Sequence, residues 1–253
     1  MEGRKIAELK HNKEVLGKNE SIFTWGWNGA AGRRRLERRV NLINDFIALH
    51  GAEAGAAKKV RILEVGCGTG LLTEHLVNFP GSRIFSFDIY DAFVKKARER
   101  TQDIDKDLFF LVSDAEHLPF LNEIFDIIVG ISVLHHLNLS SAQMEIGRVL
   151  KPGGKFIFSE PNMLNPQIFI QKNVGFIKKH MGDSPNETAF YPNRLKKSFA
   201  RHGLKVEVYP FDFLHPKTPS SLIPIVEKIG LFIEKRVFLK YIAGSLLIYG
   251  EKT

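Results

Sequence analysis

Residues 60–76 constrain the fold of this 253-residue chain more than any other stretch. An apolar run that holds one acidic residue, Glu64, breaks into glycines and then into a helix-like segment. The glycines alternate along the chain: Gly66, Gly68 and Gly70. A strand that turns through glycines into a helix leaves bare backbone at the strand's carboxyl end, where a ligand can approach closely. The stretch therefore predicts an α/β sheet with a ligand site at this turn.

The spacing of these glycines differs from that of a dinucleotide-binding fingerprint. That fingerprint places its third glycine three residues after the second, and this chain has Leu71 there. The next predicted strand, 83–87, ends at Asp88. A carboxylate at that strand end can accept hydrogen bonds from both hydroxyls of a ribose. Leu71 thus disfavours a nicotinamide-dependent oxidoreductase, although Asp88 still predicts a nucleoside-like ligand.

Strands and helices continue to alternate beyond Asp88. The further strands are predicted at 108–112, 125–130 and 155–159, with helices near 70–79, 91–101 and 140–150. Such alternation favours a parallel sheet with right-handed crossovers. After Glu160 the pattern is less regular, with helices expected at 191–200 and 222–238 and strands at 205–213 and 243–250.

Three motifs together resemble the class I S-adenosylmethionine-dependent methyltransferases, closest to the branch called type 11. They are Glu-x-Gly-x-Gly-x-Gly at 64–70, Asp88, and Leu-Lys-Pro-Gly-Gly at 150–154. The resemblance covers residues 58–160. It implies a Rossmann-like, seven-stranded mixed sheet of order 3-2-1-4-5-7-6 sandwiched by helices, with the seventh strand antiparallel. A single domain is expected, built from an N-terminal helical cap (1–57), the cofactor-binding core (58–160), and an acceptor lid with the last strands (161–253).

The same resemblance implies S-adenosyl-L-methionine as cofactor and S-adenosyl-L-homocysteine as product. In the family an aspartate, here Asp114, holds the adenine amino group. The residues expected to bind the cofactor are Glu64, Gly66, Cys67, Gly68, Gly70, Asp88, Ile89, Asp114, Ala115, Gly130 and Ile131. Arg33, at the opening of a predicted helix over 33–50, is expected to pair with the cofactor's carboxylate.

Two adjacent histidines, His135 and His136, follow the fourth strand, where the family's active site opens. An oxygen or nitrogen acceptor can need a proton removed, and a histidine can remove it near neutral pH. One of the two is the candidate general base; the alternative is that one packs at a helix start and the other is solvated. No metal is expected, because the nine histidines show no ligand spacing.

The charge of the chain is unevenly distributed. Residues 62–150 hold 7 Lys+Arg against 13 Asp+Glu, whereas the flanks, 1–61 and 151–253, are basic at +6 and +8. Acidic surroundings suit a sulfonium cation. The basic flanks indicate either an acidic acceptor or ordinary solvated lysines and arginines.

The acceptor is expected to be a small molecule, a glycan or a lipid-like compound, because 161–202 is both apolar and basic. Peripheral contact with a membrane fits this composition. Nucleic acid is disfavoured, since there is no added RNA-binding domain. A nucleic-acid methyltransferase and a non-catalytic cofactor-binding partner protein remain the alternatives. The single cysteine, Cys67, and the absence of a signal peptide or of an apolar run of ~20 residues predict a cytoplasmic protein. The oligomeric state is left open.

Overall fold

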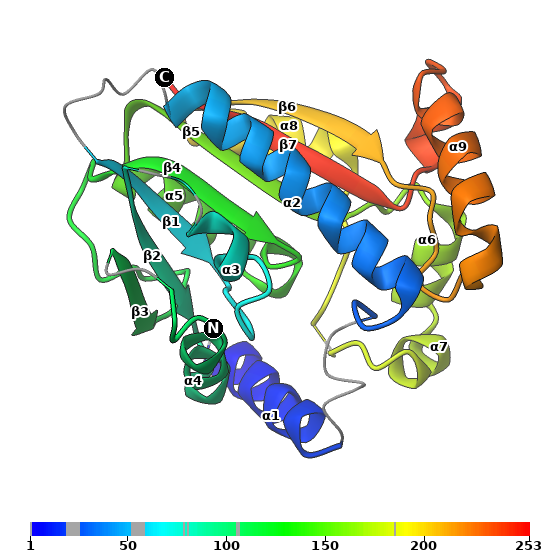
Figure 1. Ribbon diagram of the computed structural model, residues 1–253, viewed down its shortest axis with the longest axis horizontal. Helices are drawn as coiled ribbons and strands as arrows, with labels where there is room; N and C mark the ends of the chain where they lie inside the picture. The colour runs from blue at the N-terminus through cyan, green and yellow to red at the C-terminus, as the bar shows by residue number, and fades with distance from the viewer. Residues whose placement is uncertain are drawn as a thin grey trace.

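The computed structural model describes residues 2–18, 26–51, 59–77, 79, 81–104, 107–184 and 186–253. Its centre is a seven-stranded sheet in the order β3-β2-β1-β4-β5-β7-β6, which confirms the predicted order (Figure 1). The strands are β1 (Val60–Val65), β2 (Ser82–Asp88), β3 (Leu108–Val112), β4 (Phe125–Ile131), β5 (Leu150–Pro161), β6 (Leu204–Phe211) and β7 (Ser245–Lys252).

The first five strands pair in parallel, and β7 runs antiparallel between β5 and β6. β5 is longer than the predicted strand at 155–159. Leu150 already pairs with Phe125, and the register then shifts so that Lys155 pairs with Ile127. The Leu-Lys-Pro-Gly-Gly turn is therefore an irregularity within the pairing of β5 with β4, because residues on both sides of the turn pair with β4.

One face of the sheet is covered by α2 (Ala30–Gly51), α3 (Thr73–Leu76) and α4 (Asp91–Arg100). Figure 1 shows α2 lying along the strands on this face. Its buried side chains, Val40, Ile43 and Ile47, repeat every three or four residues and so form one stripe. They pack against apolar side chains of four strands, namely Ile62, Ile84, Ile127, Val129 and Ile157. The helix predicted over 33–50 is confirmed.

The opposite face is covered by α5 (Leu139–Val149) and α8 (Pro192–Ala200). Side chains such as Ile146 and Phe199 meet a core rich in phenylalanine. Phe156 stacks on Phe199 with ring centroids 5.3 Å apart. Both faces of the central parallel strands β1, β2 and β4 are thus largely buried, which explains why these strands are almost continuously apolar, whereas the edge strand β3 has no buried residue.

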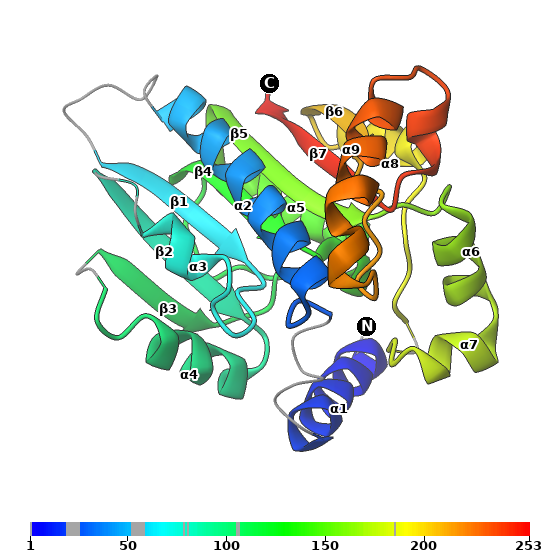
Figure 2. The same cartoon turned by 45° about the vertical axis from the view of Figure 1, so that its right-hand side comes forward.

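The first helix, α1 (Glu2–Lys18), was not predicted from the sequence. Its sequence is mostly polar, so it lacks the apolar stripe on which helix prediction depends. Both views place α1 across the carboxyl ends of the strands (Figures 1 and 2). Charged side chains attach it there: Lys5 pairs with Asp114 and Glu116, and Glu8 pairs with His136.

The chain after β5 contains further helices besides those that cover the two faces of the sheet. These are α6 (Pro166–Asn173), α7 (Gly175–His180), η3 (Ser220–Leu222), α9 (Ile223–Glu234) and η4 (Leu239–Ile242). The helix predicted at 222–238 is present over a shorter range. Its apolar residues at helical spacing, Ile225, Ile229 and Phe232, are more than half exposed instead of buried. Among the described residues, no helix combines the length and the apolar character needed to cross a bilayer.

Candidate functional site

A cavity of about 860 Å³ lies at the carboxyl ends of β1, β2 and β4. Ligand pockets typically enclose ~300–1,000 Å³, so this one lies near the upper end of that range. Its walls come from the loops after these strands, from α1 and α2, and from the segment that contains α6. In an open α/β sheet this edge is where ligands bind.

The glycine turn after β1 has a backbone that only glycine adopts easily. Gly66 has φ +71° and Gly70 has φ +83°, both in the left-handed region. A Cβ on Gly66 would lie 2.5 Å from Cγ2 of Val133, so any other residue there would have to displace the Val133 side chain. A Cβ on Gly70 would lie 3.0 Å from Cα of Ala97 in α4. The turn is therefore wedged between α4 and the loop after β4.

Asp88 is held at the end of β2 by two backbone donors. The N–H groups of Gly68 and Tyr90 each donate to its carboxylate at 3.0 Å. Burial raises its pKa, and the backbone donors counter part of that effect. Because both oxygens retain further acceptor capacity, the carboxylate can still accept hydrogen bonds from a ligand in the cavity.

Glu64 lies behind the glycine turn and is only 1% exposed. Its Oε2 accepts hydrogen bonds from the hydroxyls of Thr73 and Ser86, each at 2.6 Å. Burial raises its pKa to about 7, against the opposing effect of these two donors. Glu64 therefore joins β1, β2 and α3 and also faces the cavity.

Two further hydroxyls of the cavity wall were missed by sequence reasoning. The Oγ1 of Thr69, within the glycine turn, and the Oγ of Ser159, on β5, are buried and have no hydrogen-bond partner among the described residues. A buried polar group without a partner is costly, so each is suited to bond a polar ligand. Together with Asp88 and the glycine backbone, they fit a ligand that carries a ribose and a charged amino-acid end.

Most residues expected to bind the cofactor line the cavity, namely Glu64, Gly66, Cys67, Gly68, Asp88, Ile89, Asp114, Ala115 and Ile131. Gly70 and Gly130 do not line it; a Cβ on Gly130 would lie 2.9 Å from the ring of Phe158. These two glycines permit close packing behind the site.

Asp114 is already engaged by α1. Its carboxylate pairs with Lys5 and also accepts the backbone N–H of Glu116 at 2.9 Å. Burial tends to raise the pKa of Asp114, but hydrogen bonds from Lys5 and from the backbone of Glu116 outweigh it and lower the pKa. The side chain expected to meet an adenine amino group therefore lies under the first helix, where it is half-buried.

Arg33 lies outside the cavity wall. Its guanidinium donates to the carbonyl of Asn28, whereas Arg35 and Arg39 line the cavity. Arg39 is 2% exposed and pairs with Asp212 at 2.7 Å; Arg35 meets the same carboxylate at 2.9 Å. Arg35 and Arg39 are four residues apart and therefore share one face of α2, whereas Arg33 lies on another face. The sequence prediction chose among several neighbouring arginines without considering which face of the helix each occupies.

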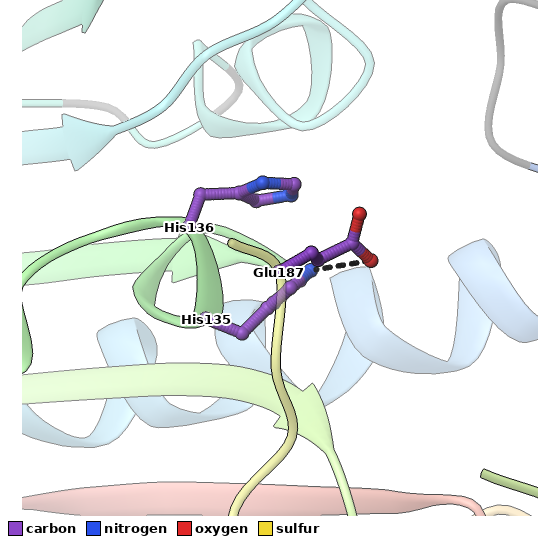
Figure 3. Close-up of side chains that lie close together, drawn as sticks. All are labelled: His135, His136 and Glu187. Atoms are coloured by element: carbon purple, nitrogen blue, oxygen red, sulfur yellow. Dashed lines mark ion pairs between the residues drawn. The ribbon is translucent and has the colours of Figure 1, made fainter. Parts of the chain in front are cut away.

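The paired histidines lie on a short 3₁₀ turn, η2 (Leu134–His136), and both line the cavity. Figure 3 shows their rings and the nearby Glu187. Nδ1 of His135 lies 2.6 Å from Glu160 Oε2, and its Nε2 lies 3.5 Å from Glu187 Oε1. Burial opposes the charged form, but the two carboxylates prevail and raise the pKa of His135 to about 9. His135 is therefore a cation at neutral pH, with both ring nitrogens facing carboxylates.

His136 differs from its neighbour. Its Nδ1 lies 2.9 Å from Glu8 Oε1, and its ring centroid lies 4.2 Å from that of His135. Candidate ligand atoms of His135, His136 and Glu187 lie within 4.8 Å of one another, so the structure assembles a cluster that sequence spacing did not indicate. Glu187 is distant in sequence and follows a loop, and we find no sequence signal that marks it.

Comparisons with known proteins agree with this geometry. The family model described as a methyltransferase domain matches residues 63–158. A malonyl-[acyl-carrier protein] O-methyltransferase from Bacillus anthracis is 31% identical over 199 residues, covering 78% of this chain and 70% of that protein. A ubiquinone biosynthesis O-methyltransferase from Coxiella burnetii is 27% identical over 158 residues, covering 62% of this chain and 65% of that protein. The matches span 56% to 70% of the length of these and one further curated relative.

Among solved structures, the N-methyltransferase NodS from Bradyrhizobium japonicum in complex with S-adenosyl-L-homocysteine has a TM-score of 0.61 at 16% identity. The match covers 96% of this chain and 97% of that one. The sheet order and the glycine turn thus define a Rossmann-like methyltransferase. The chain belongs to the class I S-adenosylmethionine-dependent methyltransferases, and its cofactor is S-adenosyl-L-methionine.

Proposed function

We propose that this protein transfers the methyl group of S-adenosyl-L-methionine to an oxygen or nitrogen atom of a small acceptor with an apolar body. The observation that carries the proposal is the single cavity wall that joins the glycine turn and Asp88 to the His135–His136 turn. A sulfonium methyl is electrophilic already, so the protein's task is to align the acceptor, exclude water and accept a proton.

The residues proposed to hold the cofactor are those of the glycine-turn half of the cavity. Asp88 would accept from the ribose hydroxyls, and the unpaired hydroxyl of Thr69 would bond the amino-acid end. Asp114 is the proposed partner of the adenine amino group, shared with Lys5. Gly66 and Gly68 have no side chains, so the cofactor can lie directly against their backbone. A Cβ on Gly66 would also contact Val133.

We assign the proton-accepting role to His136 rather than to His135. His135 is charged at neutral pH and faces carboxylates at both ring nitrogens, so it has no free lone pair to accept a proton. Nδ1 of His136 lies 2.9 Å from Glu8 Oε1, a contact that lacks hydrogen-bond geometry, so we propose that Nε2 is the nitrogen that meets the acceptor. A base that lies beside a carboxylate is a recurring arrangement. His135 then serves as a positioning residue, holding Glu160 and Glu187 beside it.

The other half of the cavity suits an acceptor with an apolar body and an acidic group. Ile168, Phe213, Leu214 and Pro216 supply apolar surface, and the cation of Lys217 stands in the same wall. Oxygen is the favoured acceptor atom, since both named relatives are O-methyltransferases. A lipid-like or thioester-linked acid or phenol fits this lining best.

The test combines a binding and a turnover measurement on the whole chain. Calorimetry with S-adenosyl-L-homocysteine, and radiolabelled methyl transfer to an alkyl-substituted catechol and a malonyl thioester, are measured for wild type, His136→Gln and Glu8→Gln. His136→Gln is expected to lower turnover about 10²–10⁴-fold and Glu8→Gln less, with product affinity unchanged in both. His75→Gln, at a half-exposed histidine on α3, is the matched control.

Three outcomes would contradict the proposal. A folded protein without affinity for the product excludes the cofactor site, and binding without transfer to any acceptor favours a non-catalytic role. Turnover lost on adding a chelator and restored by a divalent cation would assign the His135, His136 and Glu187 cluster to metal binding instead.

A further inference from the structure

The surface of segment 222–242, here called the α9 ridge, is unusually apolar for a part of the molecule that faces solvent. Its most exposed members are Phe238 at 85% and Val237 at 68%. Large apolar side chains are exposed along its whole length, namely Leu222, Ile225, Ile229, Leu231, Phe232, Val237, Phe238, Leu239, Tyr241 and Ile242. A contiguous exposed patch of this kind marks an interaction site.

The orientation of α9 is fixed by its inner face. Ile223 and Gly230 are buried, and Gly230 packs against Phe213 of the cavity wall. Glu227 pairs with Arg34 at 3.2 Å, and Glu234 pairs with Arg38 at 2.5 Å. Both acidic side chains of the ridge therefore turn inward to α2, and its apolar side faces outward as a consequence.

The outward face combines apolar and basic side chains in a regular arrangement. Ile225, Ile229 and Phe232 follow at intervals of four and three, which aligns them on one side of the helix. Lys228 and Lys235, seven residues apart, follow one edge of that stripe and are exposed. Arg236 and Lys240 add two more cations, and the guanidinium of Arg236 lies 4.4 Å from the Phe232 ring. The ridge thus presents three exposed cations, Lys228, Lys235 and Arg236, whereas Lys240 is half-buried with its Nζ 5.1 Å from the centroid of the Tyr209 ring. The two acids of the ridge are paired with arginines of α2.

We propose that the α9 ridge binds the surface of an anionic phospholipid bilayer. An amphipathic helix lies in the plane of the interface with its apolar side in the acyl boundary and its lysines at the phosphates. The long stems of Lys228 and Lys235 can reach the headgroups while Ile229 and Phe232 insert. A second copy of the chain fits less well, because a two-fold contact of the ridge with itself would bring the three exposed cations of one copy close to those of the other.

Membrane binding by the α9 ridge does not depend on the proposed methyl transfer, but the ridge lies close to the proposed acceptor site. The side-chain amide of Asn165, at the start of α6, donates to the carbonyl of Ile242 at 2.8 Å, which joins α6 to the ridge. α6 exposes Phe169 and Ile170, and its Ile168 lines the cavity. Figure 2 shows α6 beside α9. A bilayer under the ridge would therefore lie next to the acceptor half of the cavity.

The test is co-sedimentation of the full chain with vesicles of phosphatidylcholine alone and with about 30% phosphatidylglycerol. Wild type is expected to bind the anionic vesicles and to lose most of that binding at about 0.5 M salt, while neutral vesicles retain little. Ile229→Glu with Phe232→Glu should weaken vesicle binding at least tenfold. Leu49→Glu with Leu121→Glu, exposed apolar residues elsewhere, should leave it unchanged.

A second pair of variants tests the charges. Lys228→Glu with Lys235→Glu should weaken binding to anionic vesicles by about fivefold for each charge removed, while Lys95→Glu with Lys197→Glu, exposed on other helices, should not. Affinity for S-adenosyl-L-homocysteine, measured in every variant, reports an intact fold separately. Equal binding to neutral vesicles, equal losses in the control pairs, or a stable dimer in light scattering that Ile229→Glu with Phe232→Glu dissolves would each overturn the proposal.

Discussion

Replacing Gly66 by alanine tests whether the glycine turn is shaped by its contact with the loop after β4. Two costs add at this position. An L-residue at φ +71° is strained by about 1–2 kcal/mol, and a Cβ 2.5 Å from Cγ2 of Val133 must displace a partly buried side chain, at about 1–3 kcal/mol. Alanine recovers about 0.4–1 kcal/mol by restricting the unfolded chain. We expect Gly66→Ala to lower the free energy of unfolding by about 2–4 kcal/mol.

Two companion variants separate these costs. Gly153 has φ +73° and nothing within 4 Å of a Cβ, so Gly153→Ala measures the backbone cost alone, about 1 kcal/mol. Val133→Ala removes the Cγ2 atom that Gly66→Ala would meet. In the double variant, Gly66→Ala with Val133→Ala, the free energies should couple favourably by about 1–2 kcal/mol.

Urea unfolding at 25 °C gives the free energies, and calorimetry with S-adenosyl-L-homocysteine gives the affinity in each variant. Gly66→Ala should also weaken product binding, because the shifted turn moves the backbone that faces the cavity. A Gly66→Ala cost equal to that of Gly153→Ala, or strictly additive free energies in the double variant, would refute the assignment of Val133 as the constraining contact.

Two further perturbations act on buried charges. Glu64 has a pKa of about 7 in the folded state against 4.5 in the unfolded chain, so the folded state binds more protons between these values and stability falls as pH rises through them. Glu64→Gln should flatten the pH dependence of unfolding by about 3 kcal/mol between pH 4.5 and 7, and parallel curves for both proteins would contradict this. Arg39→Met leaves the buried Asp212 with Arg35 alone; we expect a loss of about 3 kcal/mol in denaturant unfolding, and a loss below 1 kcal/mol would show that the pair is dispensable.

The parallel core could be predicted from sequence because its signals are local. The strand predicted at 108–112 has the bounds that the structure shows for β3, since it is an apolar run closed by polar residues. The position of β7 between β5 and β6 came from the family resemblance, because nothing in the residues of 243–250 specifies which strands lie beside it.

The part of the site formed by the strand and glycine turn could be predicted from the sequence. The part formed by charged side chains that are far apart in the sequence could not. Gly66 and Asp88 follow from the strand–turn pattern alone. The environment of His135 depends on Glu160 and Glu187, which converge from separate loops and carry no common spacing. Glu8 was missed because it belongs to a helix without an apolar stripe, which charges hold in place.

Exposed apolar residues on α9 show the limit of periodicity as a signal. The spacing of Ile225, Ile229 and Phe232 correctly indicates a helix, but it does not say which side the helix turns to the protein. Here the buried Ile223 and Gly230, together with the ion pairs of Glu227 with Arg34 and of Glu234 with Arg38, hold the other side of the helix to the protein. Sequence reasoning assigns an apolar stripe to the interior by default, and that default fails when charges hold the other side.

The ion pairs of α2 also determine which shortened fragments of the chain can fold. The stretch that matches the methyltransferase family, 63–158, contains neither α2 nor β7. Without α2, the apolar face of the sheet would lose its cover, and Asp212 would lose both of its arginines. An expression fragment trimmed to the matched stretch should therefore aggregate, whereas one that keeps everything from Gly26 onward retains every cation that neutralises Asp212 and Glu234.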